Sequence, residues 1–338
     1  MKGQSAKAEA IYQQALQLLE TVFEKDHPDM LTSTMNLASS LVGQGKYAEA
    51  EAMQRQTLQL QETVLGKDHP DTLMSMMFLA ESLRQRGRYI EAGAMHRQTL
   101  QLREMVLGKD HPNTLRSMNC LATSIHGQGK YAEAEVMYRE TLQLQETVLG
   151  KDHPYTLRSM YNLANLLQQQ RKGTEAEAMF QQTLQLRETV LGKDHPDTLG
   201  SMTGLASSLG QQGKHVEAEA IHRQTLQLKE IMLGKDHPDT LASMMGLAET
   251  LRQQGKYTEA EAMHQQTLQL KEKVLGEDHP DTLASMMGLA ESLRQQGKYA
   301  EAETIHPRAD LESGHSQGQR LEKTGKQNMK ISGVSVPG

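Results

Sequence analysis

The sequence predicts an all-α protein, a solenoid of antiparallel helical hairpins, and three observations support this prediction. A segment containing Asp-His-Pro recurs seven times at a constant interval of 42 residues. Apolar residues between the recurrences step by three and four, which is the spacing of a helix, and no stretch alternates as a strand does. A fixed period of this length is typical of stacked units that bury their apolar faces against their neighbours. The recurring histidines are His27, His69, His111, His153, His195, His237 and His279.

The unit that begins at His69 illustrates the first helix of each hairpin. Pro70 suits the first helical position, because its missing N–H would have no intrahelical partner there. Gly87 suits the residue just past the helix end, where glycine adopts a left-handed backbone at little cost. The apolar stripe between them consists of Leu73, Met76, Ala80 and Leu83.

The second helix follows within the same unit, and the first unit predicts a buried stripe of Ala50, Met53, Thr57, Leu60 and Val64. An alanine recurs at one point of every second helix, although leucine would bury more area there. We therefore expect two helices to approach too closely at this point for a larger side chain. These alanines are Ala8, Ala50, Ala92, Ala134, Ala176, Ala218, Ala260 and Ala302.

The repeats occupy residues 1–306 as a half repeat, six full repeats and a truncated seventh. Residues 307–338 lose the period and are rich in Gly, Ser and Lys, so we expect a disordered tail. Because both ends interrupt a repeat, we expect a fragment or an incomplete gene product, with a natural short form as the alternative. One turn is irregular: residues 171–173 read Arg-Lys-Gly where most units have Gly-Lys-Tyr, which predicts a soft point, with Gly173 able to rescue the turn.

Composition narrows the function classes. The formal net charge is −6 and no basic block occurs, which argues against a nucleic-acid partner. No secretory signal and no long apolar stretch is present, so no membrane contact is expected. Cys120 is the only cysteine, which excludes a disulfide framework and a cysteine-based metal site. We expect a cytoplasmic protein with no cofactor and no small-molecule substrate.

The pattern Asn36-Leu37-Ala38, followed by Leu41, Gly45, Tyr47, Ala50 and Leu58, resembles the tetratricopeptide repeat. The 42-residue period with Leu-Gly-Lys-Asp-His-Pro resembles, more narrowly, the kinesin-light-chain-like subclass. This resemblance implies a right-handed α-α superhelix whose first helices line a concave groove for a peptide. In that family a repeated asparagine before Leu-Ala grips the peptide backbone. Only two of seven equivalent positions keep it here: Asn36, Phe78, Cys120, Asn162, Gly204, Gly246 and Gly288.

The third and fourth units diverge most from the others and therefore give the best candidates for specific binding. The resemblance places their variable side chains on the concave face, and Arg116 and Arg158 hold equivalent phases in adjacent units. We hypothesise that this patch holds an acidic or carboxylate-bearing peptide, since arginine binds carboxylates through paired hydrogen bonds. The alternative is that both arginines are solvated or pair with nearby carboxylates. The candidate groove residues are Asn36, Arg116, Asn119, His126, Arg158, Tyr161, Asn162 and Asn165.

Other motifs favour a structural role over chemistry. The pairs Glu81–Arg84, Glu249–Arg252 and Glu291–Arg294 have the spacing of ion pairs on a helix surface. Glu49 and Glu51 indicate a solvated face. The histidines of the second helices alternate with Tyr138 and Phe180 at one phase, which indicates packing rather than metal binding. They are His96, His222, His264 and His306.

These observations predict a non-enzymatic scaffold or adaptor that binds a peptide or protein partner in a concave helical groove. No residue pattern of a nucleophile with its base supports an enzyme. The alternative is the sensor or autoinhibitory repeat region of a larger signalling nucleotide-binding ATPase, of which this chain would be a fragment. No phosphate-binding Gly-x-x-x-x-Gly-Lys-Ser/Thr loop occurs in this sequence.

Overall fold

The computed structural model describes residues 2–19, 23–24 and 26–305. The predicted tail, residues 307–338, and the side chain of Ala8 lie outside the described residues. Every element within the described ranges is helical, so the predicted all-α class is confirmed there. The helices of the first repeats are α1 (Lys2–Leu19), α2 (Pro28–Gly43), α3 (Tyr47–Val64), α4 (Pro70–Gln85), α5 (Tyr89–Leu107), α6 (Pro112–Gly127) and α7 (Tyr131–Val148). The helices that follow are α8 (Pro154–Gln169), α9 (Gly173–Leu191), α10 (Pro196–Gln211), α11 (His215–Leu233), α12 (Pro238–Gln253), α13 (Tyr257–Leu275) and α14 (Pro280–Gln295).

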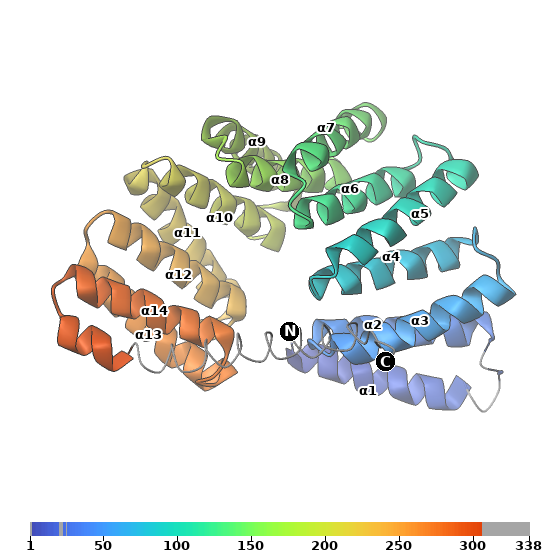
Figure 1. Cartoon of the computed structure of the whole chain (residues 1–338), viewed down its shortest axis with the longest axis horizontal. Helices are drawn as coiled ribbons and strands as arrows, with labels where there is room; N and C mark the ends of the chain where they lie inside the picture. Colours follow the sequence, from blue (N-terminus) through green and yellow to red (C-terminus); the bar gives the residue numbers. More distant parts are fainter. Residues whose placement is uncertain (1, 20–22, 25, 306–338) are drawn as a thin grey trace, which may run out of the picture. The chain divides into compact units, whose positions relative to one another are not determined.

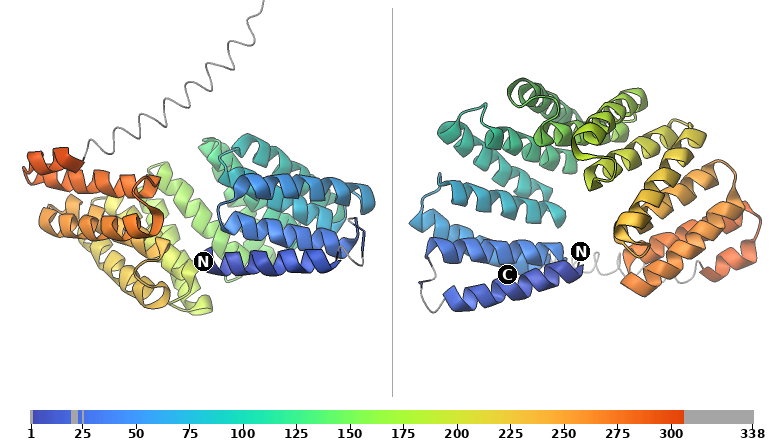
Figure 2. Two further views of the ribbon diagram at one scale, coloured as in Figure 1. Left: turned by 90° about the horizontal axis from the view of Figure 1, so that it is seen from below. Right: turned by 180° about the vertical axis from the view of Figure 1, so that it is seen from behind.

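The chain divides into two compact units, residues 1–179 and 180–338. In the first unit each helix from α1 to α8 packs against the next in sequence, and the first helices α2, α4, α6 and α8 also contact one another in order (Figure 1). In the second unit α10 to α14 follow the same scheme, with α12 touching both α10 and α14. Figure 2 shows the antiparallel course of consecutive helices within each unit, most clearly for the blue and the orange pairs. A further helical stretch, residues 299–305, follows α14.

Each first helix begins at the Asp-His-Pro segment, as predicted, and the histidine is its N-cap. In all seven units the imidazole Nδ1 accepts a hydrogen bond from the backbone N–H two residues later, at 3.1–3.2 Å. The proline occupies the first turn in each unit. The capping histidine therefore satisfies one of the backbone donors that every helix start leaves unpaired.

The hairpin turns place glycine in the left-handed backbone region, as the sequence predicts. Gly87 and Gly129, for example, have φ of 75° and 78°. The irregular turn differs, because Arg171 itself adopts φ 61°, alone among the described non-glycine residues. Gly173 begins α9 and does not take the left-handed position, so the predicted rescue by Gly173 was wrong. The chain keeps the turn geometry and places the strain on an arginine.

The predicted stripe of the first helix is confirmed, since Leu73, Met76, Ala80 and Leu83 are all buried. The predicted stripe of the second helix was only partly right. Ala50 and Thr57 are buried, but Val64 is exposed, and the buried face includes instead two glutamines. The buried polar residues of α3 are Glu51, Gln54, Thr57 and Gln61.

The recurring alanine of the second helix is fully buried at all seven positions where the structure describes its side chain. In α7, Ala134 has an exposed fraction of 0%. The prediction of a close approach at this position is consistent with that burial, because no surface remains on which a larger side chain could be placed without moving a neighbour.

Candidate functional site

Two adjoining cavities, each of about 440 Å³, open within the first unit between the first helices α4, α6 and α8. We call the first the arginine cavity. Its lining comprises Met77, Phe78, Glu81, Arg84, His96, Arg116, Asn119, Cys120, Thr123, Arg158 and Asn162. The second, the tyrosine cavity, is lined by Arg84, Tyr89, Thr123, His126, Gly127, Gly129, Tyr131, Tyr138, Asn162, Asn165 and Gln169. Arg84, Thr123 and Asn162 belong to both linings, so the two cavities are neighbours, and we refer to them together as the recess.

Arg116 and Arg158 lie together in the arginine cavity, as their equivalent phases predict. Both guanidinium groups lie near the ring of Tyr155, with Cζ 6.0 Å and 5.4 Å from its centroid respectively. Neither arginine forms an ion pair with any described residue. The Nε of Arg116 and the Nε and Nη2 of Arg158 are buried and lack a hydrogen-bond partner in the described part of the chain. The alternative that these arginines pair with nearby carboxylates is therefore not what the structure shows.

The unpartnered nitrogens of Arg158, Nε and Nη2, form the edge with which a guanidinium holds a carboxylate. In the same cavity, Arg84 uses its Nε and Nη2 to hold both carboxylate oxygens of Glu81, with Nε–Oε2 at 2.8 Å. Arg158 presents the same two nitrogens without an acceptor. A planar carboxylate accepts two parallel hydrogen bonds from such an edge. The cavity wall carries three arginines and one glutamate, so it is positive in a chain whose net charge is −6.

Two of the candidate asparagines, Asn119 and Asn162, join adjacent repeats. Asn119 is only 2% exposed, and its Nδ2 donates to Ser159 Oγ at 2.6 Å. The Nδ2 of Asn162 donates to Oδ1 of Asn119 at 2.9 Å, and Asn165 donates to the carbonyl of Tyr161 at 3.0 Å. Both polar atoms of the Asn119 side chain thus have partners within the protein, and its role as a ligand-contacting residue of the arginine cavity stays a prediction.

The remaining candidates lie in different places. Asn36 is exposed on α2 and lines neither cavity, and Tyr161 is also outside both linings. His126 lines the tyrosine cavity, where its Nε2 lies 2.7 Å from Oε1 of Gln169. The structure therefore gathers Arg116, Arg158, Asn162 and their neighbours into one recess but leaves Asn36 and Tyr161 apart from it.

His96 forms part of the wall of the arginine cavity and carries no hydrogen-bond partner. It is 1% exposed, and both ring nitrogens are buried and unpaired among the described residues. Burial, reinforced by the positive charges of Arg84 and Arg103 and opposed by Glu81, lowers the pKa of His96 to about 4. The imidazole is therefore neutral at physiological pH and offers one N–H donor and one acceptor.

The phase occupied by His96 packs against the next repeat, which explains the glycines of the last units. A Cβ placed on Gly288 would lie 2.6 Å from the ring of His264, and one on Gly246 would lie 3.0 Å from His222. Phe180 lies even closer to Gly204. These glycines occupy the position before Leu-Ala at which the family has asparagine, and they make room there for a ring from the preceding second helix. The prediction that this phase serves packing is supported by these contacts.

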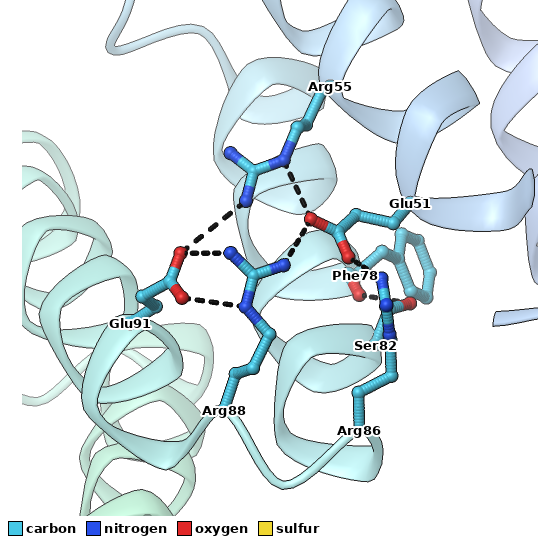
Figure 3. Close-up of polar contacts among 7 residues, drawn as sticks. All are labelled: Glu51, Arg55, Phe78, Ser82, Arg86, Arg88 and Glu91. Carbon is cyan, nitrogen blue, oxygen red and sulfur yellow. Dashed lines mark hydrogen bonds and ion pairs between the residues drawn. The ribbon is translucent and has the colours of Figure 1, made fainter. Parts of the chain in front are cut away.

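The expectation that Glu51 lies on a solvated face was wrong. Its side chain has a relative exposure of 8% and binds three arginines, as Figure 3 shows. Arg55 Nε and Arg88 Nη1 donate to Oε1 at 2.9 Å and 2.6 Å, and Arg86 binds Oε2. Burial raises the pKa of Glu51, but the hydrogen bonds from Arg55 and Arg88 outweigh it and hold the pKa below its usual value. Glu49, by contrast, is exposed.

Two of the three predicted surface pairs form. Glu81 binds Arg84, and Glu249 accepts from Nε of Arg252 at 2.9 Å. Glu291 accepts from Nε2 of Gln295 at 2.9 Å, and it makes no ion pair with Arg294 within the described residues. The described ranges contain no cluster of three His, Cys, Asp or Glu side chains that could hold a metal ion. No described helix is both long and apolar enough to cross a bilayer.

The sequence interpretation missed Tyr155 and undervalued His96. In most units an acidic residue such as Asp71 or Asp197 directly follows Asp-His-Pro, and in the fourth unit Tyr155 replaces it. That replacement, together with Arg158 three positions later, was a detectable signal of a local change in function. Nothing in the sequence showed that His96 would face a cavity, because its environment is created by helices of the following repeats.

Comparisons with known proteins agree with this architecture. Two family models described as tetratricopeptide repeat match the chain, one at residues 2–29, 30–71 and 72–113, the other at 114–172, 158–231, 205–273 and 239–309. No curated protein matches the sequence.

Several solved structures are similar. One is a Podosopora anserina protein assigned as a kinesin light chain with nearly identical TPR-like repeats; it is 28% identical, and the match covers 61% of this chain and 98% of that chain with a TM-score of 0.53. The apo form of the quorum sensor NprR from B. thuringiensis is 14% identical, with 91% and 83% covered and a TM-score of 0.69. A signal transduction ATPase with a tetratricopeptide repeat sensor from Pyrococcus horikoshii is 12% identical, with 93% and 45% covered and a TM-score of 0.61. The last two share the fold.

Proposed function

This chain belongs to the tetratricopeptide repeat family, with repeats of the kinesin-light-chain-like kind and an α-α superhelix fold, and on that basis we propose that it is a non-enzymatic adaptor that docks a peptide segment in the recess between α4, α6 and α8. Tetratricopeptide arrays are protein-interaction scaffolds, since stacked hairpins present long surfaces to a partner. The proposal includes a cytoplasmic location, which a single cysteine favours.

One observation supports the recess above other surfaces. The Nε–Nη2 edge of Arg158 and the Nε of Arg116 belong to positively charged groups, are buried, and have no acceptor among the residues that the structure describes. Burying hydrogen-bond donors without partners is costly, so a bound acceptor adds more affinity here than at a solvated arginine. An acidic side chain of a peptide supplies a planar carboxylate of the right shape and charge. Asn162 lines both cavities and Asn165 lines the tyrosine cavity, so both are available to contact neighbouring residues of the proposed peptide.

The test begins with selection of ligands, because the natural partner is not needed for it. The full chain would be immobilised and screened against a displayed library of random peptides, and enriched peptides would be synthesised and their Kd measured. We expect acidic residues among the enriched peptides. The double variant R116A/R158A should weaken their binding by about tenfold or more, since hydrogen bonds to charged groups contribute about 1.5–3 kcal/mol.

The matched control is Arg97→Ala on α5. Arg97 is 59% exposed and lies 3.7 Å from Glu133, so its removal changes the net charge by the same sign outside the recess. Peptide binding should be unchanged in this variant. Enriched peptides that bind R116A/R158A as tightly as the wild-type chain would contradict the proposed site.

A further inference from the structure

Cys120 lies in the wall of the arginine cavity, on α6, one helical turn after Arg116. It is the only cysteine of the chain and is partly exposed. Burial raises the pKa of its thiol, while the positive charges of Arg158 and Arg116, which lie close enough to act on it, oppose that rise. The thiolate fraction of Cys120 at neutral pH is therefore small, which makes it a weak nucleophile toward an uncharged reagent.

The surroundings of Cys120 indicate a ligand independently of the thiol. His96, 1% exposed, contributes two unpaired ring nitrogens to the same wall. Arg158 contributes an unpaired donor edge, and Arg116 a third donor. The one carboxylate in the wall, Glu81, is already held by Arg84. A small molecule with a carboxylate would satisfy these donors and bring the rest of its structure against the sulfur.

We infer that Cys120 is a modification site for small disulfides that carry a carboxylate, and that the resulting mixed disulfide occupies the arginine cavity. This inference rests on the same two arginines as the proposed peptide site. The thiolate of Cys120 attacks one sulfur of the reagent, a new S–S bond forms and the reagent's S–S bond breaks. The reagent's disulfide is the oxidant, one of its sulfurs leaves as a thiolate, and that thiolate takes up a proton equivalent to the one that Cys120 released. The adduct fills the space that an acidic peptide side chain would occupy, and it therefore excludes the peptide.

Three disulfides of similar size separate charge recognition from simple accessibility. They are 3,3′-dithiodipropionate, which carries carboxylates, bis(2-hydroxyethyl) disulfide, which is neutral, and cystamine, which carries ammonium groups. Rates of adduct formation on the full chain would be measured by intact mass spectrometry and divided by the rates for a short cysteine peptide. We expect the normalised rate for dithiodipropionate to exceed that for cystamine by about tenfold or more.

The variants assign that preference to its cause. R116A/R158A should abolish it, whereas Arg97→Ala should retain it. A competition measurement needs no variant. Succinate should slow the reaction of dithiodipropionate with the wild-type chain, and the rate of the neutral disulfide is the baseline for this comparison. Equal normalised rates for the three reagents, a preference that survives R116A/R158A, or no reaction with any reagent would each overturn the inference.

The two proposals fail in different ways. If peptides bind through the arginines but Cys120 shows no preference, only the modification site is wrong. If Cys120 shows the preference but peptide binding ignores the arginines, only the proposed function is wrong. Cys120→Ser, which removes the thiol and leaves the arginines in place, should make whatever peptide binding it retains insensitive to dithiodipropionate.

Discussion

Replacing His222 and His264 by phenylalanine should remove a large part of the acid sensitivity of the second unit. Both rings are buried in second helices, against Gly246 and Gly288 respectively. Phe180 shows that a phenyl ring fits the same position against a glycine. The substitution therefore keeps the packing and removes only the titrating nitrogens.

The magnitude follows from the pKa values. Burial, with a smaller contribution from the positive charge of Lys229, lowers the pKa of His222 to about 4. Burial does the same for His264, where Glu249 opposes and Arg252 and Lys271 add to the effect, again giving about 4. The unfolded chain, with a histidine pKa of about 6.5, binds the proton first, so stability is present above that pH and is lost as the pH falls toward 4. Between pH 7 and pH 5 each histidine should cost about 2 kcal/mol, and the pair about 4 kcal/mol.

Urea unfolding followed by circular dichroism at pH 7 and pH 5 would measure this loss. The difference between the wild-type chain and H222F/H264F isolates the two rings, because the capping histidines are common to both. His215→Tyr, which removes a partly exposed histidine from the same helix α11, serves as the matched control. If the wild-type chain and H222F/H264F lose equal stability between the two pH values, the reasoning about buried neutral imidazoles is wrong.

Further predictions concern the turns and the packing of the first unit. Arg171→Gly should stabilise the chain by about 0.5–1 kcal/mol in urea unfolding, because glycine takes a positive φ without a Cβ clash, whereas Arg171→Ala should not. Brief trypsin digestion should cut at residues 171–173 before the other turns, and uniform resistance would contradict a soft point there. Ala134→Leu should lower stability by about 1–3 kcal/mol in a thermal melt, while the exposed Ala132→Leu should be nearly neutral. Glu51→Gln should cost about 1–3 kcal/mol in urea unfolding, because three arginines lose their shared carboxylate, and the same loss in the exposed control Glu49→Gln would refute this explanation.

Helix limits were predictable from the sequence because they depend on local backbone constraints. Pro70 fixes the start of a first helix, and Gly87 fixes its end, with no need of the neighbouring repeats. Arg171 marks the limit of such reasoning. In this turn the glycine stands two positions later than in the other turns, at Gly173, yet the left-handed residue stays at the position that stacking requires. Arg171 therefore adopts the unfavourable φ. Tertiary packing thus decided a conformation that residue preferences alone would have placed at Gly173.

The buried face of the second helix was harder to predict because its burial is imposed by two neighbouring helices. Hydrophobicity favoured Leu60 and Val64, yet Gln54 and Gln61 are buried in α3 and Val64 is exposed. Glu51 is buried for a related reason, since arginines of the next hairpin reach it. Glu51 can occupy a buried position because the adjacent repeat supplies its arginine partners, and a single repeat does not reveal those partners.

The arginine pair of the candidate site was predictable, because equivalent phases in adjacent repeats must be neighbours in a stack. Their lack of carboxylate partners was not, since it depends on which way each side chain points. Tyr155 of α8 lies beside both guanidinium groups, and His96 of α5 lines the arginine cavity from a different helix. Sites assembled between repeats therefore require the coordinates, while sites within a helix can be inferred from periodicity.

The pairing of a ring on one hairpin with a glycine on the next restricts how such a gene can be recombined. Phe78 occupies in α4 the position that Gly204 occupies in α10. If the hairpin that carries Phe78 followed the helix that carries Phe180, two phenyl rings would share a space that now holds one ring. His264 with Gly288 repeats the combination of His222 with Gly246, so two successive junctions of the second unit use the same ring and the same glycine. Correct stacking of two hairpins thus depends on a matched ring and glycine at their interface. Chimaeras that join hairpins with mismatched residues at this interface should misassemble, even though every hairpin in them is native.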